Sequence, residues 1–185
     1  MKIKVVPRKF FLDIKGTEEE EKIINDWNII SICTPAYPPK GFEEETVPFS
    51  DYDRSNILVL WFHDTDYQAD DHVVLFDENM ALQILDFIER TIGDGKGYIV
   101  HCTAGFSRSQ AVGMVLNDVI NKLILHDHCD YEQFEQENQN KRRPNSLVKK
   151  LLLNVFENNF NALEKSWTRL SSKSRDLPIQ EAQII

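Results

Sequence analysis

The sequence has few cysteines, no long hydrophobic run and fewer basic than acidic residues. Its three cysteines among 185 residues, Cys33, Cys102 and Cys129, are a small and odd number, which argues against a disulfide framework. Unpaired thiols suit a reducing compartment, so we expect a cytoplasmic protein. Lysine and arginine number 21 against 30 acidic residues, which gives a net charge of −9. That balance argues against broad binding to nucleic acids or to anionic membranes, because both require a basic surface.

The apolar residues, 42% of the chain, are spread along it rather than gathered in one segment. No apolar run approaches the ~20 residues that cross a bilayer, and residues 1–8 lack the apolar region of a secretory signal. A chain of this length is typical of one globular domain. We expect that domain over residues 1–167 and a loosely ordered tail over residues 168–185, where the sequence becomes polar and loses its periodicity.

Short apolar runs alternate with segments of helical periodicity. Strands are predicted within residues 2–14 (one or two, interrupted at Pro7) and at residues 29–33, 57–62 and 98–102. Helices are predicted at residues 18–27, 78–92, 108–123, 131–139 and 146–160, and four prolines indicate a long loop over residues 34–50. The alternation predicts an α/β fold, with a central, largely parallel β-sheet flanked by helices on both faces. In such sheets ligands bind beyond the carboxyl ends of the strands.

Residues 98–109 have the sequence YIVHCTAGFSRS, which predicts a strand, a tight turn and the start of a helix. Backbone N–H groups and the helix dipole at such a turn bind a tetrahedral dianion and stabilise a thiolate, whose pKa can fall from ~8.5 to roughly 3.5–7.5. Arg108 would close this cradle with a planar fork that matches two phosphate oxygens. Gly105 allows torsions or close approaches that a Cβ would obstruct. The pattern predicts covalent phosphoryl transfer to the sulfur of Cys102.

This segment, His101 to Ser109, resembles the H-C-x-x-G-x-x-R-[ST] signature of cysteine-dependent protein tyrosine phosphatases, and most closely that of the dual-specificity branch. The resemblance is specific over about residues 55–160. It implies a phosphatase-type fold, Cys102 as nucleophile, and Arg108 as the residue that binds phosphate and stabilises the transition state. It also implies that Ser109 helps the thiolate leave and that His101 supports the thiolate. The phosphate-binding loop would consist of Thr103, Ala104, Gly105, Phe106 and Ser107, with no cofactor and no metal.

Phosphoryl transfer also requires a proton donor for the leaving oxygen. In the resembling family this donor is an aspartate on a loop that follows a strand. Asp64 matches that position best and Asp66 is the second choice, while Asp70 and Asp71 stay open. The turn Arg142-Arg143-Pro144-Asn145 resembles the family's turn beside the cradle, where Arg143 and Asn145 would have a supporting role.

The resemblance implies hydrolysis of phosphate monoesters through a phosphocysteine, on phosphotyrosine and, as an open alternative, on phosphoserine or phosphothreonine. The expected partner is a phosphorylated protein or peptide, with no nucleic acid and no membrane insertion. Two alternatives remain: a non-catalytic phosphate-binding module, and a phosphatase of this fold acting on a phosphoinositide or an RNA 5′-phosphate. A protective disulfide between Cys33 and Cys102, known in some family members, also stays open.

Overall fold

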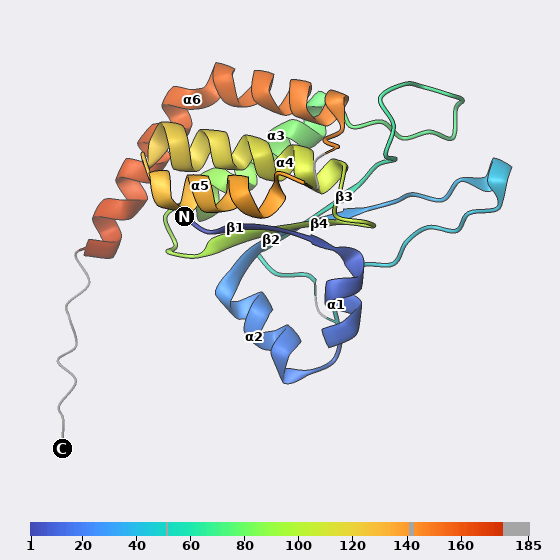
Figure 1. Ribbon diagram of the computed structural model, residues 1–185, viewed down its shortest axis with the longest axis horizontal. Helices are drawn as coiled ribbons and strands as arrows, with labels where there is room; N and C mark the ends of the chain where they lie inside the picture. Colours follow the sequence, from blue (N-terminus) through green and yellow to red (C-terminus); the bar gives the residue numbers. More distant parts are fainter. Residues whose placement is uncertain (51, 141–142, 176–185) are drawn as a thin grey trace.

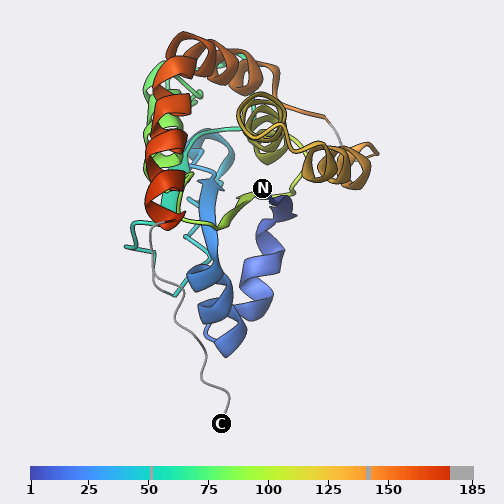
Figure 2. The ribbon, with the colours of Figure 1, turned by 90° about the vertical axis from the view of Figure 1, so that its left-hand side faces the viewer.

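The computed structural model describes residues 1–50, 52–140 and 143–175. Within these residues the chain forms one sheet of four parallel strands in the order β1-β4-β2-β3. The strands are β1 (Ile3–Pro7), β2 (Trp27–Cys33), β3 (Ile57–Trp61) and β4 (Gly97–Cys102). Helices cover both faces of the sheet (Figures 1 and 2). The predicted α/β class, with a parallel central sheet between helices, is confirmed.

One pair of helices covers one face of the sheet, and the remaining helices cover the other (Figure 1). The first pair is α1 (Arg8–Ile14) and α2 (Glu18–Asp26). The second group is α3 (Glu78–Thr91), α4 (Arg108–Leu116), α5 (His128–Asn138) and α6 (Ser146–Arg175). A π-helical segment, η2 (Asn117–Ile124), continues α4, and a single 3₁₀ turn, η1 (Pro38–Lys40), lies in the long loop.

Side-chain alternation along the strands divides the apolar core into two layers. Ile29 and Ile99 pack towards α1 and α2, whereas their neighbours Ile30 and Val100 belong to the larger layer under α3–α6. All four side chains are buried. Because both faces of β2 and β4 are covered, these strands appear in the sequence as nearly continuous apolar runs, the pattern that predicts them.

Several predicted boundaries are wrong for identifiable reasons. Residues 8–14 form α1 rather than a second strand, because Phe11 and Ile14 lie one helical turn apart and are both buried. Helix α5 begins at His128, three residues early, since the side chain of Asp127 accepts from Asp130 N at 3.1 Å and caps it. Helix α6 runs to Arg175 instead of ending near Phe160, and the rest of the expected tail, residues 176–185, lies outside the described residues.

The predicted starts of α2 and α3 are confirmed by their caps. Thr17 Oγ1 accepts from Glu20 N, and Asp77 Oδ1 accepts from Met80 N at 2.8 Å. The carboxylate of Glu20, which is 3% exposed, accepts from Gly16 N and from both the N–H and the hydroxyl of Ser50. These bonds fix the end of the loop over residues 34–50.

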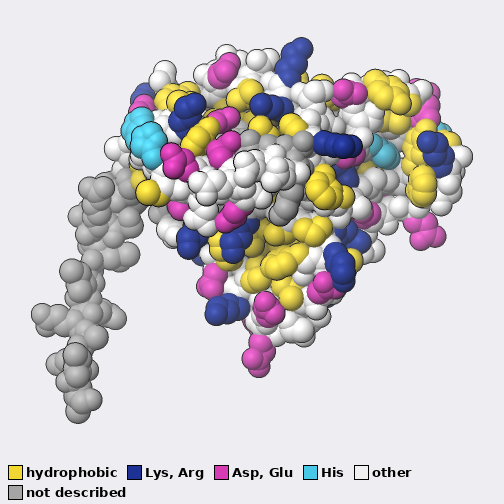
Figure 3. Space-filling view, in the orientation of Figure 1, with side chains coloured by type: hydrophobic (Ala, Val, Ile, Leu, Met, Phe, Trp, Pro, Cys, Tyr) yellow, Lys and Arg dark blue, Asp and Glu magenta, His cyan; other side chains and the backbone are white. Residues whose placement is uncertain are grey.

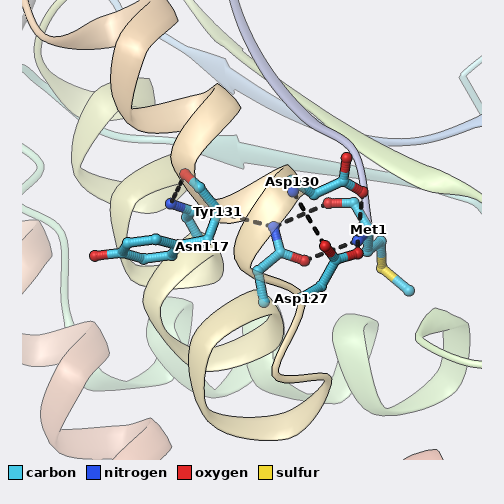
Figure 4. Close-up of polar contacts among 6 residues, drawn as sticks. Met1, Asn117, Asp127, Asp130 and Tyr131 are labelled. Atoms are coloured by element: carbon cyan, nitrogen blue, oxygen red, sulfur yellow. Dashed lines mark hydrogen bonds and ion pairs between the residues drawn. The ribbon is translucent and has the colours of Figure 1, made fainter.

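The beginning of β1 is held against α5 and η2 by polar contacts (Figure 4). The amino group of Met1 lies 3.2 Å from Asp127 Oδ2 and 2.7 Å from Asp130 Oδ2, and it donates to Asn121 Oδ1 at 2.9 Å. Asn121 Nδ2 donates in turn to Met1 O and to Asn117 Oδ1.

In the described part of the chain, no helix has the length and apolar content to span a membrane.

Candidate active site

The segment 103–107, called the cradle below, connects the carboxyl end of β4 to the first residue of α4. It packs against the junction of β1 and α1, where Arg8 N donates to Thr103 O at 3.3 Å. Gly105 has a φ of +75°, and a Cβ there would lie 2.9 Å from Pro7 N and 3.0 Å from the carbonyl carbon of Val6. The close approach that requires glycine is therefore to the end of β1.

Gly105→Ala is expected to lower the free energy of unfolding by about 2–4 kcal/mol, because it adds a backbone clash to the cost of a left-handed residue. Gly95→Ala is the matched control. Gly95 has a φ of +81°, but a Cβ added there would meet no atom within 4 Å. It should lose only about 1 kcal/mol. Urea denaturation of both variants measures the difference, and equal losses would contradict the role assigned to the contact with β1.

Cys102 and Ser109 face each other at the base of the cradle. The sulfur lies 3.0 Å from Ser109 Oγ, and the two residues are 1% and 0% exposed. An anionic sulfur only accepts hydrogen bonds, so in that state the hydroxyl donates to it. Cys33 is also buried and forms no disulfide, and burial raises the pKa of its thiol. That shift leaves Cys33 a poorer nucleophile than an exposed thiol.

The guanidinium of Arg108 is buried and held by four hydrogen bonds. Nη1 donates to Phe62 O at 2.7 Å and to Cys33 O at 3.4 Å, while Nη2 donates to Thr34 Oγ1 at 3.0 Å and Thr103 Oγ1 at 2.8 Å. Arg108 is 3% exposed, and its Nε has no hydrogen-bond partner among the described residues. A buried donor of this kind is expected to find its acceptor in a ligand or a water molecule.

His101 lies behind the cradle, fully buried, with Nε2 2.8 Å from Ser31 Oγ. The rings of Phe11 and Phe49 pack against its imidazole at centroid distances of 5.1 and 5.7 Å. Burial, reinforced by the positive charges of Arg8 and Arg108, lowers the pKa of His101 to about 3. The imidazole is therefore neutral at physiological pH and holds its place through Ser31 and the two aromatic rings.

The buried neutral histidine predicts acid destabilisation. An unfolded chain protonates His101 below ~pH 6.5 and the folded protein only near its lowered pKa, so stability falls as pH falls between these values. From about pH 7 to about pH 5 this residue should account for a loss of about 2 kcal/mol. In urea unfolding, His101→Gln should lack that loss, whereas the variant of the exposed His128, His128→Gln, should retain it. An unchanged pH dependence in His101→Gln would refute the assignment.

Asp64 lies against the cradle, and Asp66 does not. Asp64 Oδ1 accepts from Ser107 Oγ at 2.6 Å and from Asn145 Nδ2 at 3.1 Å. Asp66 Oδ2 instead accepts from Ser146 Oγ, at the first residue of α6. Asp70 accepts from the hydroxyl of Tyr37 on the neighbouring loop, and this bond raises the pKa of Tyr37 and lowers that of Asp70.

The turn before α6 braces the cradle. Arg143 N donates to Phe106 O at 3.2 Å and Asn145 N to Ser107 O at 3.3 Å. Asn145 also caps α6, since its Oδ1 accepts from Val148 N while its Nδ2 reaches Asp64. Asn145 therefore joins the helix and the aspartate loop through its side chain, and the cradle through its backbone N–H. Arg142, named with this turn in the sequence, lies outside the described residues.

Comparison with known proteins adds little. No family model matches the chain, and no curated protein does. The crystal structure of Tk-PTP in the active form is 17% identical, with a TM-score of 0.37, over 88% of this chain and 90% of that one. A mutant form of Tk-PTP is 16% identical, with a TM-score of 0.39, over 94% and 92%. Likeness at this level shows no family.

Three residues of the long loop that the sequence did not single out contribute to the site. Thr34 accepts from Arg108, Glu45 Oε1 accepts from Thr103 Oγ1 at 2.9 Å, and Glu45 Oε2 accepts from Thr34 N at 2.8 Å. Tyr37 joins this loop to Asp70. Thr34 carries a detectable signal, because it directly follows the carboxyl end of β2, as Cys102 ends β4 and Asp64 follows β3. No group of three or more potential metal ligands occurs among the residues that the structure describes.

Proposed function

We propose that this protein is a cysteine-dependent phosphatase of the dual-specificity type, which hydrolyses phosphate monoesters through a phosphocysteine on Cys102. One arrangement carries the proposal. The Cys102 sulfur lies 3.0 Å from Ser109 Oγ in the first turn of α4, and that helix begins with the buried Arg108, whose Nε has no partner among the described residues. Backbone N–H groups at a helix start and a desolvated guanidinium stabilise a tetrahedral oxyanion. A thiol in that position becomes a nucleophile towards phosphorus.

The first chemical step forms a bond between sulfur and phosphorus and breaks the bond between phosphorus and the ester oxygen. Arg108 and the cradle N–H groups bind the phosphoryl oxygens, and Asp64 in its protonated form gives its proton to the leaving oxygen. Both hydrogen bonds to Asp64 reach Oδ1, so we assign the proton transfer to the other carboxyl oxygen. The products are an alcohol or phenol and the phosphocysteine.

The second step breaks the bond between sulfur and phosphorus. A water molecule attacks phosphorus, its proton passes to the Asp64 carboxylate, and the departing thiolate accepts a hydrogen bond from Ser109 Oγ. Inorganic phosphate leaves, and Asp64 regains the proton that it gave away in the first step. No metal or organic cofactor takes part, because the cradle and Arg108 supply the positive field.

A phosphorylated protein or peptide is the proposed substrate, and phosphotyrosine the first residue to test. The side chain of Phe106, in the cradle itself, is 49% exposed. An exposed ring at this place offers a stacking surface to an aryl phosphate. Serine and threonine phosphates remain the second choice within the dual-specificity type.

Incubation with an aryl phosphate in the presence of a chelator tests the proposal. The wild-type protein should turn the substrate over, and an acid quench should trap one phosphoryl group on the peptide that contains Cys102, detectable by mass spectrometry. The alternative is a binding module that holds phosphate without reacting. Phosphate binding with no turnover and no trapped intermediate would favour that alternative and refute the phosphatase.

A further inference from the structure

Two loops beside the cradle carry a net negative charge. Residues 34–50 hold three glutamates and one lysine, and residues 62–77 hold five aspartates with no lysine or arginine. With neutral histidines these eight carboxylates and one ammonium give a charge of −7, against −9 for the whole chain. Arg8 and Arg143, whose backbone N–H groups donate to the cradle, bring this sum only to −5. The cradle, which we propose binds phosphate, is thus flanked by loops that are negatively charged, as phosphate itself is.

Both loops touch the cradle and each other. Glu45 accepts from Thr103 Oγ1, Asp64 accepts from Ser107 Oγ, and Tyr37 joins the two loops through Asp70. Figure 3 shows acidic side chains on both loops where they protrude at the right of the view. Most of the other carboxylates in these loops, among them Glu43 and Glu44, are exposed. These exposed carboxylates can therefore interact with the parts of a substrate that lie next to its phosphate. We expect Arg108 to bind that phosphate, because its buried Nε lacks a partner among the described residues.

We propose that the substrate is a phosphorylated peptide segment with lysine or arginine beside the phosphorylated residue, and that more anionic phosphate esters are rejected. This inference rests on the phosphatase proposed above. Glu45 and Asp64 contact the cradle directly, and the screening length at physiological salt is about 8 Å, so charges beside a bound phosphate lie within reach of both loops. The cradle selects the phosphate, and the loops select its neighbours by charge.

Phosphotyrosine peptides that differ only in the flanking residues test this selection. We expect kcat/KM to be about tenfold higher with flanking lysines than with flanking glutamates at low salt, since each exposed ion pair is worth a factor of about two to five. The ratio should narrow at about 0.15 M salt. An RNA oligonucleotide with a 5′-phosphate and a phosphoinositide head group should both be poorer substrates than the lysine peptide.

Two double variants distinguish the effect of the loop carboxylates from the effect of the protein's net charge. Glu43→Gln with Glu44→Gln should reduce the lysine preference about threefold or more. Glu157→Gln with Glu164→Gln removes the same charge from exposed positions on α6, roughly 17 and 27 Å along the helix from Ser146, and should leave the preference unchanged. Equal kcat/KM for all peptides, faster turnover of the RNA or phosphoinositide, or equal effects of the two double variants would overturn the inference.

The same peptides also distinguish this inference from the proposed function. Their affinities for Cys102→Ser, measured by fluorescence anisotropy, do not depend on turnover. If the wild-type protein hydrolyses none of the peptides, the phosphatase fails, and a lysine preference in binding still supports the charge selection. If all peptides are hydrolysed but bind Cys102→Ser with equal affinity, the phosphatase stands and the charge selection fails.

Discussion

Cys102→Ser should reduce kcat for an aryl phosphate by at least about 10⁴-fold, because a hydroxyl at this position is not ionised and neither His101 nor Ser109 is placed to take its proton. His101, the adjacent imidazole, lies behind the cradle with Nε2 on Ser31 Oγ and is buried among aromatic rings. Ser109, the group nearest to the sulfur, is itself a hydroxyl. Phosphate binding should survive, since Arg108 and the backbone N–H groups remain. Steady-state turnover and phosphate affinity together measure the effect.

Cys129→Ser is the matched control for this experiment. Cys129 is exposed in the first turn of α5, so its replacement should leave kcat within a factor of about two. Turnover that persists in Cys102→Ser would show that sulfur is not the nucleophile. Loss of both turnover and phosphate affinity would indicate a damaged cradle, and the free energy of unfolding of the variant then tells whether the fold itself has failed.

The parts of the site that are local in sequence were predictable. His101, Cys102, Arg108 and Ser109 lie within nine residues, and the path of β4 into α4 alone brings them together. The same holds for Asp77, whose side chain caps the helix that begins one residue later. In such segments the backbone geometry of one strand, turn and helix determines the arrangement, so the sequence contains nearly all the information.

The contacts between distant segments were not predictable, even where a residue such as Thr34 or Asn145 carries a signal of its own. Thr34 meets Arg108 across 74 positions of sequence, and Asn145 reaches Asp64 across 81. Nothing local distinguishes Glu45, which touches the cradle, from the exposed Glu43 and Glu44 beside it. Which carboxylate of a loop faces inward depends on how the loop folds back, and a loop with four prolines has no periodicity from which to infer that path.

Long-range contacts also decide which aspartate we assign as the general acid. The sequence favours Asp64 and leaves Asp66, Asp70 and Asp71 open. Of these, Asp64 is bonded to the cradle, while Asp66 is bonded to Ser146 and Asp70 to Tyr37. The contact with Ser107 favours Asp64 by position, because a proton donor must reach the oxygen that leaves opposite the sulfur. Its role in catalysis stays a prediction.

Asp64→Asn should reveal the general acid through its dependence on the leaving group. Asparagine keeps an acceptor for Ser107 and Asn145 but has no proton to give at the pH of the assay. We therefore expect kcat to fall about 10²- to 10³-fold for phenyl phosphate, whose leaving oxygen needs a proton. For a dinitrophenyl phosphate, which leaves readily as the anion, the first step should be slowed by less than about tenfold. The burst of phenolate release in rapid-mixing experiments isolates that step.

Asp66→Asn provides the control, because it makes the same change two residues away on a side chain bonded to Ser146. It should reduce kcat for both substrates by no more than about threefold. If Asp66→Asn showed the leaving-group dependence and Asp64→Asn did not, the proton donor would be Asp66, and the loop would have to swing Ser146 and Asp66 apart before reaction. If neither variant did, the leaving oxygen would take its proton from water, and the contact between Asp64 and Ser107 would serve only to position the cradle.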